Sequence, residues 1–238
     1  MTAPAPDIWV YLSQTPLLWL AVTLIAYLIG VWCFERSAMS PLANPVAIAT
    51  LLIMAVLGAT DTTYETYFEG AQFVHFMLGP ATVALALPMV RHLPRVRAAG
   101  APLLAALLAG AATAVAVALI TASMLGASRQ TLLSLAPKSV TTPIAMGISE
   151  AVGGIPSLTA SLVIATGILG AMLGTPLLNL LGVRDWRARG FALGVAAHGI
   201  GTARAFQVNQ VAGVFAAIGM GANGIASSVL VPLAVSFL

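Results

Sequence analysis

Apolar stretches follow one another along the whole chain, and short segments marked by Pro, Gly or charge separate them. A helix of about 20 apolar residues crosses the hydrocarbon core of a bilayer, and Pro and Gly are typical of helix boundaries. The pattern therefore predicts an all-α polytopic membrane protein. The predicted apolar segments lie at residues 17–34, 45–60, 71–90, 101–125, 132–150, 156–181, 190–206 and 208–237.

The composition agrees with this fold class. Only 7% of the 238 residues are charged and 60% are hydrophobic, whereas a soluble domain carries roughly 25% charged residues. We therefore expect a single membrane domain over residues 1–238. No Lys or Arg precedes the first apolar run, so we expect no cleaved signal peptide.

The charged residues predict how the chain is oriented. Most of the ten Lys and Arg residues lie in three connecting stretches, whereas residues 60–70 contain acidic side chains and no basic one. By the positive-inside rule, the basic stretches lie in the cytoplasm, and residues 60–70 and the N-terminus lie outside. The basic residues of these stretches are Arg36; Arg91, Arg95 and Arg97; and Arg184, Arg187 and Arg189, and the acidic ones of 60–70 are Asp61, Glu65 and Glu69.

This orientation requires an interrupted element at 132–150. Segment 101–125 would end outside and segment 156–181 would have to begin outside, so 132–150 enters and leaves on one face. We predict a re-entrant hairpin or a broken helix pair there. The glycine-rich segment 190–206 either re-enters from the cytoplasm or crosses fully. The prediction is about six full spans with one or two broken elements, an inverted-repeat arrangement typical of secondary transporters.

The stretch PKSVTTPIAMGISE (137–150) holds the only lysine of the chain. An ammonium group in hydrocarbon costs ~2.5–3.5 kcal/mol, so Lys138 either reaches the interface from a helix end or lines a wet cavity and binds an anion. The hydroxyls of Ser139, Thr141 and Thr142 would then contribute to the site. Glu150 is either a helix-end carboxylate or a proton-coupling residue.

A second group of polar residues lies in HGIGTARAF (198–206). Histidine is the side chain whose ordinary pKa lies near neutrality, which makes His198 a candidate site residue, and the Arg204 guanidinium suits a carboxylate. These two residues do not share a helix face, so they converge only if the helix breaks at Gly199 and Gly201.

Other polar and glycine residues have structural interpretations or mark a second interrupted element. In GPATVALALP (79–88), Thr82 follows Gly79 and Pro80, and this stretch shares a short pattern with APKSVTTPIA (136–145). Polar residues within apolar segments are expected to bond helix to helix, and Gly-x-x-x-Gly pairs favour close helix packing. These residues are Asn44 and Asn223, and the glycine pairs are Gly170 with Gly174 and Gly190 with Gly194.

Enzyme and nucleic-acid signatures are missing from the sequence. The chain has one cysteine, Cys33, and three histidines, which form no metal-ligand motif. It has no hydrolase, metalloprotease or phosphate-loop motif and no basic patch with interleaved aromatic residues. We therefore expect no enzyme activity, no cofactor, no metal and no nucleic-acid partner.

Several stretches together resemble the LrgB/CidB family of bacterial inner-membrane proteins, to which the C-terminal half of the plastid glycolate/glycerate translocator is also similar. The resemblance runs from about residue 44 to the end, so we divide the domain into an N-terminal span and loop (1–43) and an LrgB-like region (44–238). Gly147 departs from the pattern, because the resemblance implies an acidic residue there. The stretches are NPVAIA, YETYFEGAQFVHFMLGPATVALALP, LAPKSVTTPIAMGISEAVGGIPSLTA, ARGFALGVAAHGIGTARAF and MGANGIASSVLVPL.

The resemblance implies two rival functions. One is antiholin-like modulation of murein hydrolase export and cell lysis, together with a small LrgA/CidA-like membrane partner. The other is transport of a small monocarboxylate of the pyruvate, glycolate, glycerate or lactate class, and the isolated cations and hydroxyls favour it. We expect a homodimer in the bacterial inner membrane. The expected substrate site comprises Lys138, Ser139, Thr141, Thr142, His198, Gly199, Gly201 and Arg204 with Thr82 nearby, and Glu150 is the candidate proton carrier.

Overall fold

The computed structural model describes residues 16–77, 80, 84, 94 and 100–237. The chain divides into two compact units, Met1–Ala84 and Leu85–Leu238. The predicted site residue Thr82 lies outside the described residues, as do most of 78–99 and the basic residues within that stretch.

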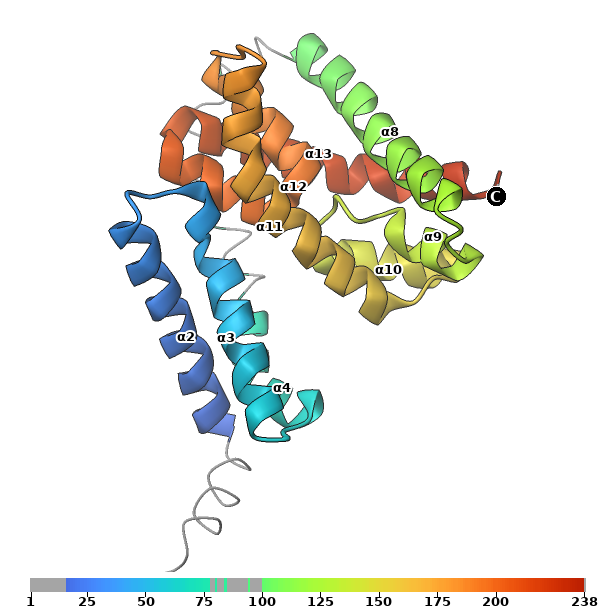
Figure 1. Cartoon of the computed structure of the whole chain (residues 1–238). Coiled ribbons are helices and arrows are strands. Elements are labelled where there is room, and N and C mark those ends of the chain that lie inside the picture. The colour runs from blue at the N-terminus through green and yellow to red at the C-terminus, as the bar shows by residue number, and fades with distance from the viewer. Residues whose placement is uncertain (1–15, 78–79, 81–83, 85–93, 95–99, 238) are drawn as a thin grey trace, which may run out of the picture. The chain divides into compact units, whose positions relative to one another are not determined.

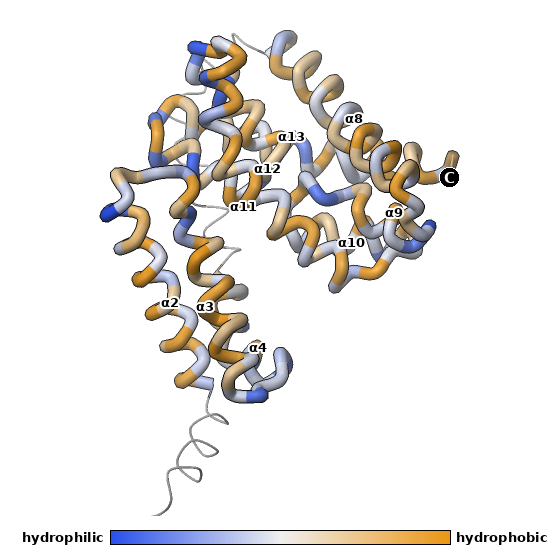
Figure 2. The backbone as a smooth tube through the Cα atoms, in the orientation of Figure 1, coloured by the Kyte–Doolittle hydropathy of each residue, from blue (hydrophilic) through white to orange (hydrophobic). Residues whose placement is uncertain are grey.

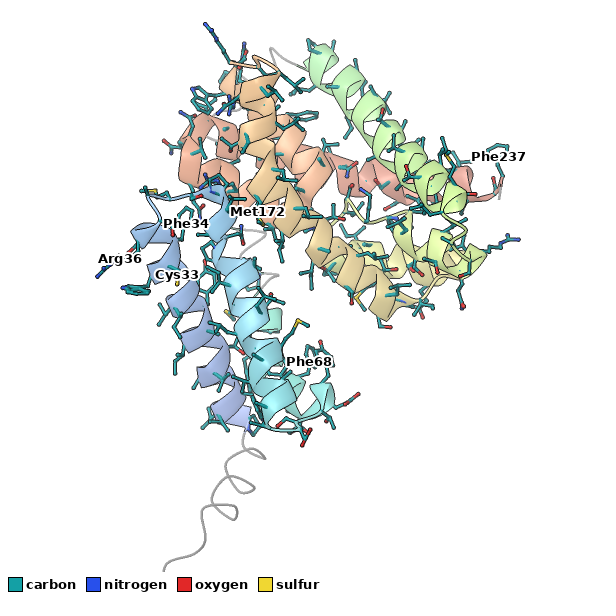
Figure 3. The ribbon with its side chains drawn as sticks, in the orientation of Figure 1. Cys33, Phe34, Arg36, Phe68, Met172 and Phe237 are labelled. Carbon is teal, nitrogen blue, oxygen red and sulfur yellow. The ribbon has the colours of Figure 1, made fainter. Side chains whose placement is uncertain are left out.

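The first unit contains the helices α2 (Pro16–Arg36), α3 (Pro45–Ala59) and α4 (Tyr64–Phe76), with a 3-10 turn at Pro41–Ala43 (Figure 1). Gly30 lies against the carbonyl group of Pro45 with no room for a Cβ atom, so α2 and α3 pack closely. Arg36 is the last residue of α2 (Figure 3), and its guanidinium lies 5.1 Å from the Trp32 ring centre. An Arg stacked on an aromatic ring is suited to a membrane interface.

Two expectations for this unit are corrected. We expected residues 60–70 to connect two apolar segments, but α4 already begins at Tyr64. In this helix the Tyr67 ring packs edge to face against Trp19 of α2, with 6.0 Å between the ring centres. We expected Asn44 to join two helices. Its side chain instead caps α3 by accepting hydrogen bonds from the backbone of Val46 and Ala47, which satisfies amides that no helical carbonyl reaches.

Long apolar helices confirm a membrane protein. Among the described residues, four helices are long and apolar enough to cross a bilayer: α2, α8 (Gly100–Met124), α11 (Pro156–Leu180) and α13 (Gln210–Val235). A helix of 25 residues, the length of α8 and of α11, extends about 37 Å, more than the ~30 Å of hydrocarbon. The hydropathy colouring of Figure 2 shows these helices as largely apolar.

The segment 132–150 folds as two short helices, α9 (Arg129–Leu135) and α10 (Thr142–Val152), joined by residues 136–141. With 7 and 11 residues, neither is long enough to span a bilayer. In Figure 1, α8 and α11 run in opposite directions, so this pair joins two helix ends on the same side of the second unit. We call α9, α10 and their connection the first hairpin.

A network of hydroxyls ties the first hairpin to the start of α11. Thr159 Oγ1 lies 2.9 Å from the Ser134 carbonyl oxygen and 2.7 Å from Ser149 Oγ. Ser134 Oγ accepts a hydrogen bond of 2.8 Å from the Ile155 amide. Because Ser134, Ser149 and Thr159 are fully buried, these bonds hold α9, α10 and α11 in one arrangement.

The helix α12 (Trp186–Val208) is broken, with non-helical backbone angles at Ala197 (φ −129°) and His198 (φ 41°). A Cβ atom on Gly201 would lie 2.7 Å from the carbonyl oxygen of Leu193. Residues eight apart in a continuous helix are about 12 Å apart along its axis, so the second half of α12 folds back on the first. We call residues 186–208 the second hairpin. A break at Gly199 and Gly201 was the condition for His198 and Arg204 to converge, but the break lies just before these glycines.

Glycines set the directions of the helices around this hairpin. Gly190 and Gly194 lie against the backbone of Ala212 and Ala216, so the first half of α12 runs parallel to the start of α13. On α11, a Cβ atom on Gly170 would meet Ala197 and one on Gly174 would meet Leu193, so α11 runs antiparallel to it. Both predicted Gly-x-x-x-Gly pairs are therefore confirmed as close-packing sites.

The two hairpins pack against opposite ends of α13. Val231 and Val235, near its C-terminal end, share a buried cluster with Leu132 and Ile148 of the first hairpin. Val214 and Phe215, near its N-terminal end, share another with Phe191 and Val195 of the second. The two helix interruptions therefore approach each other near the middle of α13.

Candidate functional site

The two helix interruptions meet at Asn223, which is 1% exposed on α13. Its side-chain amide donates to the carbonyl oxygen of Ser139 in the first hairpin (3.2 Å) and to that of Val195 in the second (3.0 Å). Its oxygen accepts from Ser227 Oγ at 3.2 Å. This confirms that Asn223 bonds one helical element to another, and it places both hairpin connections beside one side chain.

The broken backbone explains why an amide is needed here. In a continuous helix the Val195 carbonyl would accept from the amide of Gly199, and the break at Ala197 and His198 interrupts this pattern. Ser139 lies in the irregular connection between α9 and α10. Buried carbonyl groups require donors, and one primary amide supplies a hydrogen to each.

His198 forms the turn of the second hairpin and is 4% exposed. Its Nε2 lies 2.9 Å from the Val163 carbonyl oxygen of α11, and because a carbonyl only accepts, Nε2 carries the hydrogen. The His198 carbonyl accepts from Thr202 Oγ1 at 2.8 Å. On α11, a Cβ atom at Gly167 would lie 2.7 Å from His198 Cε1, so the glycine makes space for the imidazole.

Lys138 lies in the first hairpin connection, partly buried, with Nζ 3.3 Å from Ser139 Oγ. No carboxylate among the described residues pairs with it, since Arg187 with Asp185 is the ion pair found in that part of the chain. A partly buried cation with no acidic neighbour is suited to an anionic ligand.

A cavity of about 820 Å³ opens beside Lys138 and Ser139, between α8 and the two interruptions. Its polar groups are the Lys138 ammonium and the hydroxyl-bearing residues Ser139, Thr113 and Thr121, and the remaining lining is apolar. We call it the central cavity. Our sequence-based prediction missed Thr113 and Thr121, two hydroxyl-bearing residues of the largely apolar helix α8. The lining residues are Ala109, Gly110, Thr113, Ala114, Val117, Ala118, Thr121, Ala122, Leu125, Leu135, Lys138, Ser139 and Ala196.

The remaining predicted residues of the first hairpin lie at the ends of α10. Thr141 is the N-cap residue of α10 and Thr142 its first residue, and both are partly buried outside the lining of the central cavity. Glu150 lies near the other end of α10 and is exposed. Glu150 does not line the central cavity.

The remaining predicted residues of the second hairpin pack within α12 and against α13. Gly199 faces Met220, and Gly201 lies on the inside of the bend, against Ala197 and the Leu193 carbonyl group. Arg204 is 8% exposed, and its Nη1 lies 3.4 Å from Gln207 Oε1. The structure therefore places Lys138 and Ser139 on the central cavity, whereas neither His198 nor Arg204 lines it.

Comparison with known proteins identifies relatives over nearly the whole chain. Residues 23–237 match the model of the LrgB-like family. The chain is 32% identical over 226 residues to proteins named antiholin-like protein LrgB from Bacillus mycoides (strain KBAB4), Bacillus cereus (strain B4264) and Bacillus anthracis (strain CDC 684 / NRRL 3495). These alignments cover 95% of this chain and 98% of each relative. No solved structure matches the chain significantly.

Proposed function

The chain belongs to the LrgB-like family, and from the geometry of its two hairpins we propose that it is a secondary carrier for a small carboxylate anion. The observation that carries this proposal is Lys138 in the central cavity, with no acidic partner among the described residues. A cation in a largely apolar setting is costly, and a bound anion offsets that cost.

The groups around the central cavity suit a carboxylate of a few carbon atoms. The ammonium of Lys138 supplies charge, and Ser139, Thr113 and Thr121 supply hydroxyl donors to carboxylate, keto or hydroxy oxygens. The helix α10 begins at Thr142, close to Lys138 in the chain, and a helix N-terminus favours negative charge. Monocarboxylates of the pyruvate, glycolate, glycerate and lactate class fit this set of donors.

The order of elements supports alternating access. The first hairpin is followed by α11 and the second by α13, so a hairpin and a long helix occur twice in succession. The glycine contacts indicate that α11 and α13 run in opposite directions, as inverted repeats require. In this proposal both hairpins re-enter the inner membrane, from opposite faces, with the N-terminus of the chain outside.

Uptake into proteoliposomes tests the carrier function. Purified protein should accumulate at least one of labelled pyruvate, glycolate, glycerate and lactate, and Lys138→Gln should abolish most of this uptake. Arg129→Gln is the matched control, because Arg129 is an exposed cation at the start of α9 that does not line the cavity. No uptake of any of the four solutes, or equal loss in both variants, contradicts the proposal.

The second candidate is antiholin-like activity with a small LrgA/CidA-like membrane partner. The printed names of the relatives favour this candidate. In that case Lys138→Gln would leave the cellular lysis phenotype unchanged, and the chain would co-purify with the partner from co-expressing cells. Loss of the phenotype in Lys138→Gln but not in Arg129→Gln would instead link it to solute binding.

A further inference from the structure

A second cavity, of about 600 Å³, adjoins the central cavity and leads towards the start of α12. The two cavities share Gly110, Ala114 and Ala196 as lining residues. The second cavity is also lined by Asp185 and Arg187 at the start of α12. The positive-inside rule predicts that this end of the second cavity faces the cytoplasm.

The two cavities together follow one face of α8 over most of its length. Their lining positions recur every three or four residues, the spacing of one helix face. Leu104, Leu108 and Ile120 lie between these positions and line neither cavity. The recurring positions are Leu103, Ala106, Gly110, Ala114, Val117, Thr121 and Leu125.

We propose that the two cavities form one solute passage along α8, and that Arg187 is an anion-binding residue at its cytoplasmic end, where a solute carboxylate replaces Asp185 on the guanidinium. This inference rests on the proposed carrier function and names a second binding position on the route. Lys138 and Arg187 then attract the anion at two successive places, one in each cavity.

The Asp185–Arg187 pair has the geometry that a carboxylate ligand needs. Arg187 Nη2 lies 2.6 Å from Asp185 Oδ2, and its Nε lies 3.1 Å from Oδ1, so the guanidinium already binds a carboxylate with two nitrogens. The side chains are 55% and 45% exposed, and exposed pairs of this kind contribute little stability. A second carboxylate therefore exchanges with Asp185 at little cost.

The neighbouring residues Arg184 and Arg189 are not placed to bind a carboxylate in the passage. Arg184 is exposed and lines neither cavity. Arg189 is 8% exposed and donates to the Val183 carbonyl (2.9 Å) and to Asn179 Oδ1 (2.7 Å).

Hydrogen bonds from Arg187 lower the pKa of Asp185 to about 2, so Asp185 stays ionised and competes with solute throughout the neutral range.

The passage is tested by thiol labelling, which requires no transport. In a Cys33→Ser background, single cysteines replace Ala106, Ala114 and Thr121 on the cavity face, and Leu104, Leu108 and Ile120 on the other face. A charged, membrane-impermeant methanethiosulfonate reagent, applied to inside-out and right-side-out vesicles, should modify the first set at least tenfold faster. Equal rates, or faster labelling of the second set, overturn the passage even if the protein transports solute.

The role of Arg187 is tested with the solute found in the uptake assay. In inside-out vesicles, Arg187→Gln should raise the KM about tenfold, a factor that corresponds to the loss of one charge-assisted hydrogen bond, whereas Arg184→Gln should not change it. Asp185→Asn keeps a helix-capping side chain but removes the competing charge, so it should lower the KM. If Arg187→Gln and Arg184→Gln have the same KM as the unmodified protein, Arg187 is not a binding residue, and the carrier function still stands.

Discussion

His198 has a backbone conformation that residues other than glycine seldom adopt. Such a conformation costs ~1–3 kcal/mol and persists only where the surroundings hold it. Here the surroundings are the Val163 carbonyl, Thr202 Oγ1 and the open space at Gly167. The break in α12 is therefore stabilised mainly by contacts from α11, and the contacts of one residue decide the shape of the hairpin.

Gly167→Ala should disturb this turn. The added Cβ would lie 2.7 Å from His198 Cε1, and overpacking of this kind costs about 1–3 kcal/mol. We expect a lower thermal unfolding temperature in detergent and reduced uptake. Gly221→Ala on α13 is the control, since no atom lies within 4 Å of its added Cβ. Equal stability of the two variants would show that the fit of His198 against α11 is not required.

Asn223→Ala should separate the two hairpin connections. The substitution removes the donor of two buried carbonyls, and each unpaired group costs about 1–3 kcal/mol. Asn223→Asp should be at least as harmful, because a carboxylate repels both carbonyl oxygens. Ser228→Ala on the same helix removes only a bond to the Gly224 carbonyl and should be nearly neutral. Urea or thermal unfolding measures all three, and a neutral Asn223→Ala would contradict a bridging role.

At the scale of elements, the sequence predicted which segment must be interrupted, but it did not predict the residues at which the backbone of α12 breaks. The charges on either side of 132–150 required an even number of crossings, and this segment folds as the two short helices α9 and α10. The break in α12 is set by tertiary contacts. Gly167 and Gly170 of α11 make room for His198 and Ala197, and no local pattern in 190–206 records that contact.

The candidate site was predictable only in part, for the same reason. Lys138 and Ser139 stand out in an apolar sequence, and the structure places both on the central cavity. Thr113 and Thr121 carry no local signal, because a threonine in a spanning helix commonly bonds to its own backbone. Their face of α8 becomes a cavity wall only through the packing of α8 against the two hairpins.

Labelling of hairpin ends tests this arrangement of elements. In the Cys33→Ser background, Gln130→Cys lies at the start of the first hairpin and Ser157→Cys just after its end, and Arg184→Cys and Gln210→Cys flank the second hairpin. All four positions are exposed. An impermeant maleimide should label the first two only from outside and the last two only from the cytoplasm. Opposite faces for the two ends of one hairpin would mean that it crosses the membrane.

At the scale of the whole molecule, the relation between the two hairpins distinguishes a carrier from a pore. Two hairpin-and-helix units that run in opposite directions allow a central site to open to one side at a time. A pore is open to both sides and lets solute pass down its gradient without exchange. The two functions therefore differ in how solute on one side affects movement from the other.

Counterflow measures that difference directly. Proteoliposomes loaded with unlabelled solute should transiently accumulate external labelled solute above its equilibrium level. The reason is that the binding site of a carrier turns back to the outside faster when it holds unlabelled solute. Lys138→Gln should abolish the overshoot, since the ammonium of Lys138 is the charge that holds the anion in the central cavity. Arg129→Gln should keep it. Uptake without an overshoot, accompanied by release of an uncharged dye of similar size, would indicate a pore and favour the antiholin-like function over a carrier.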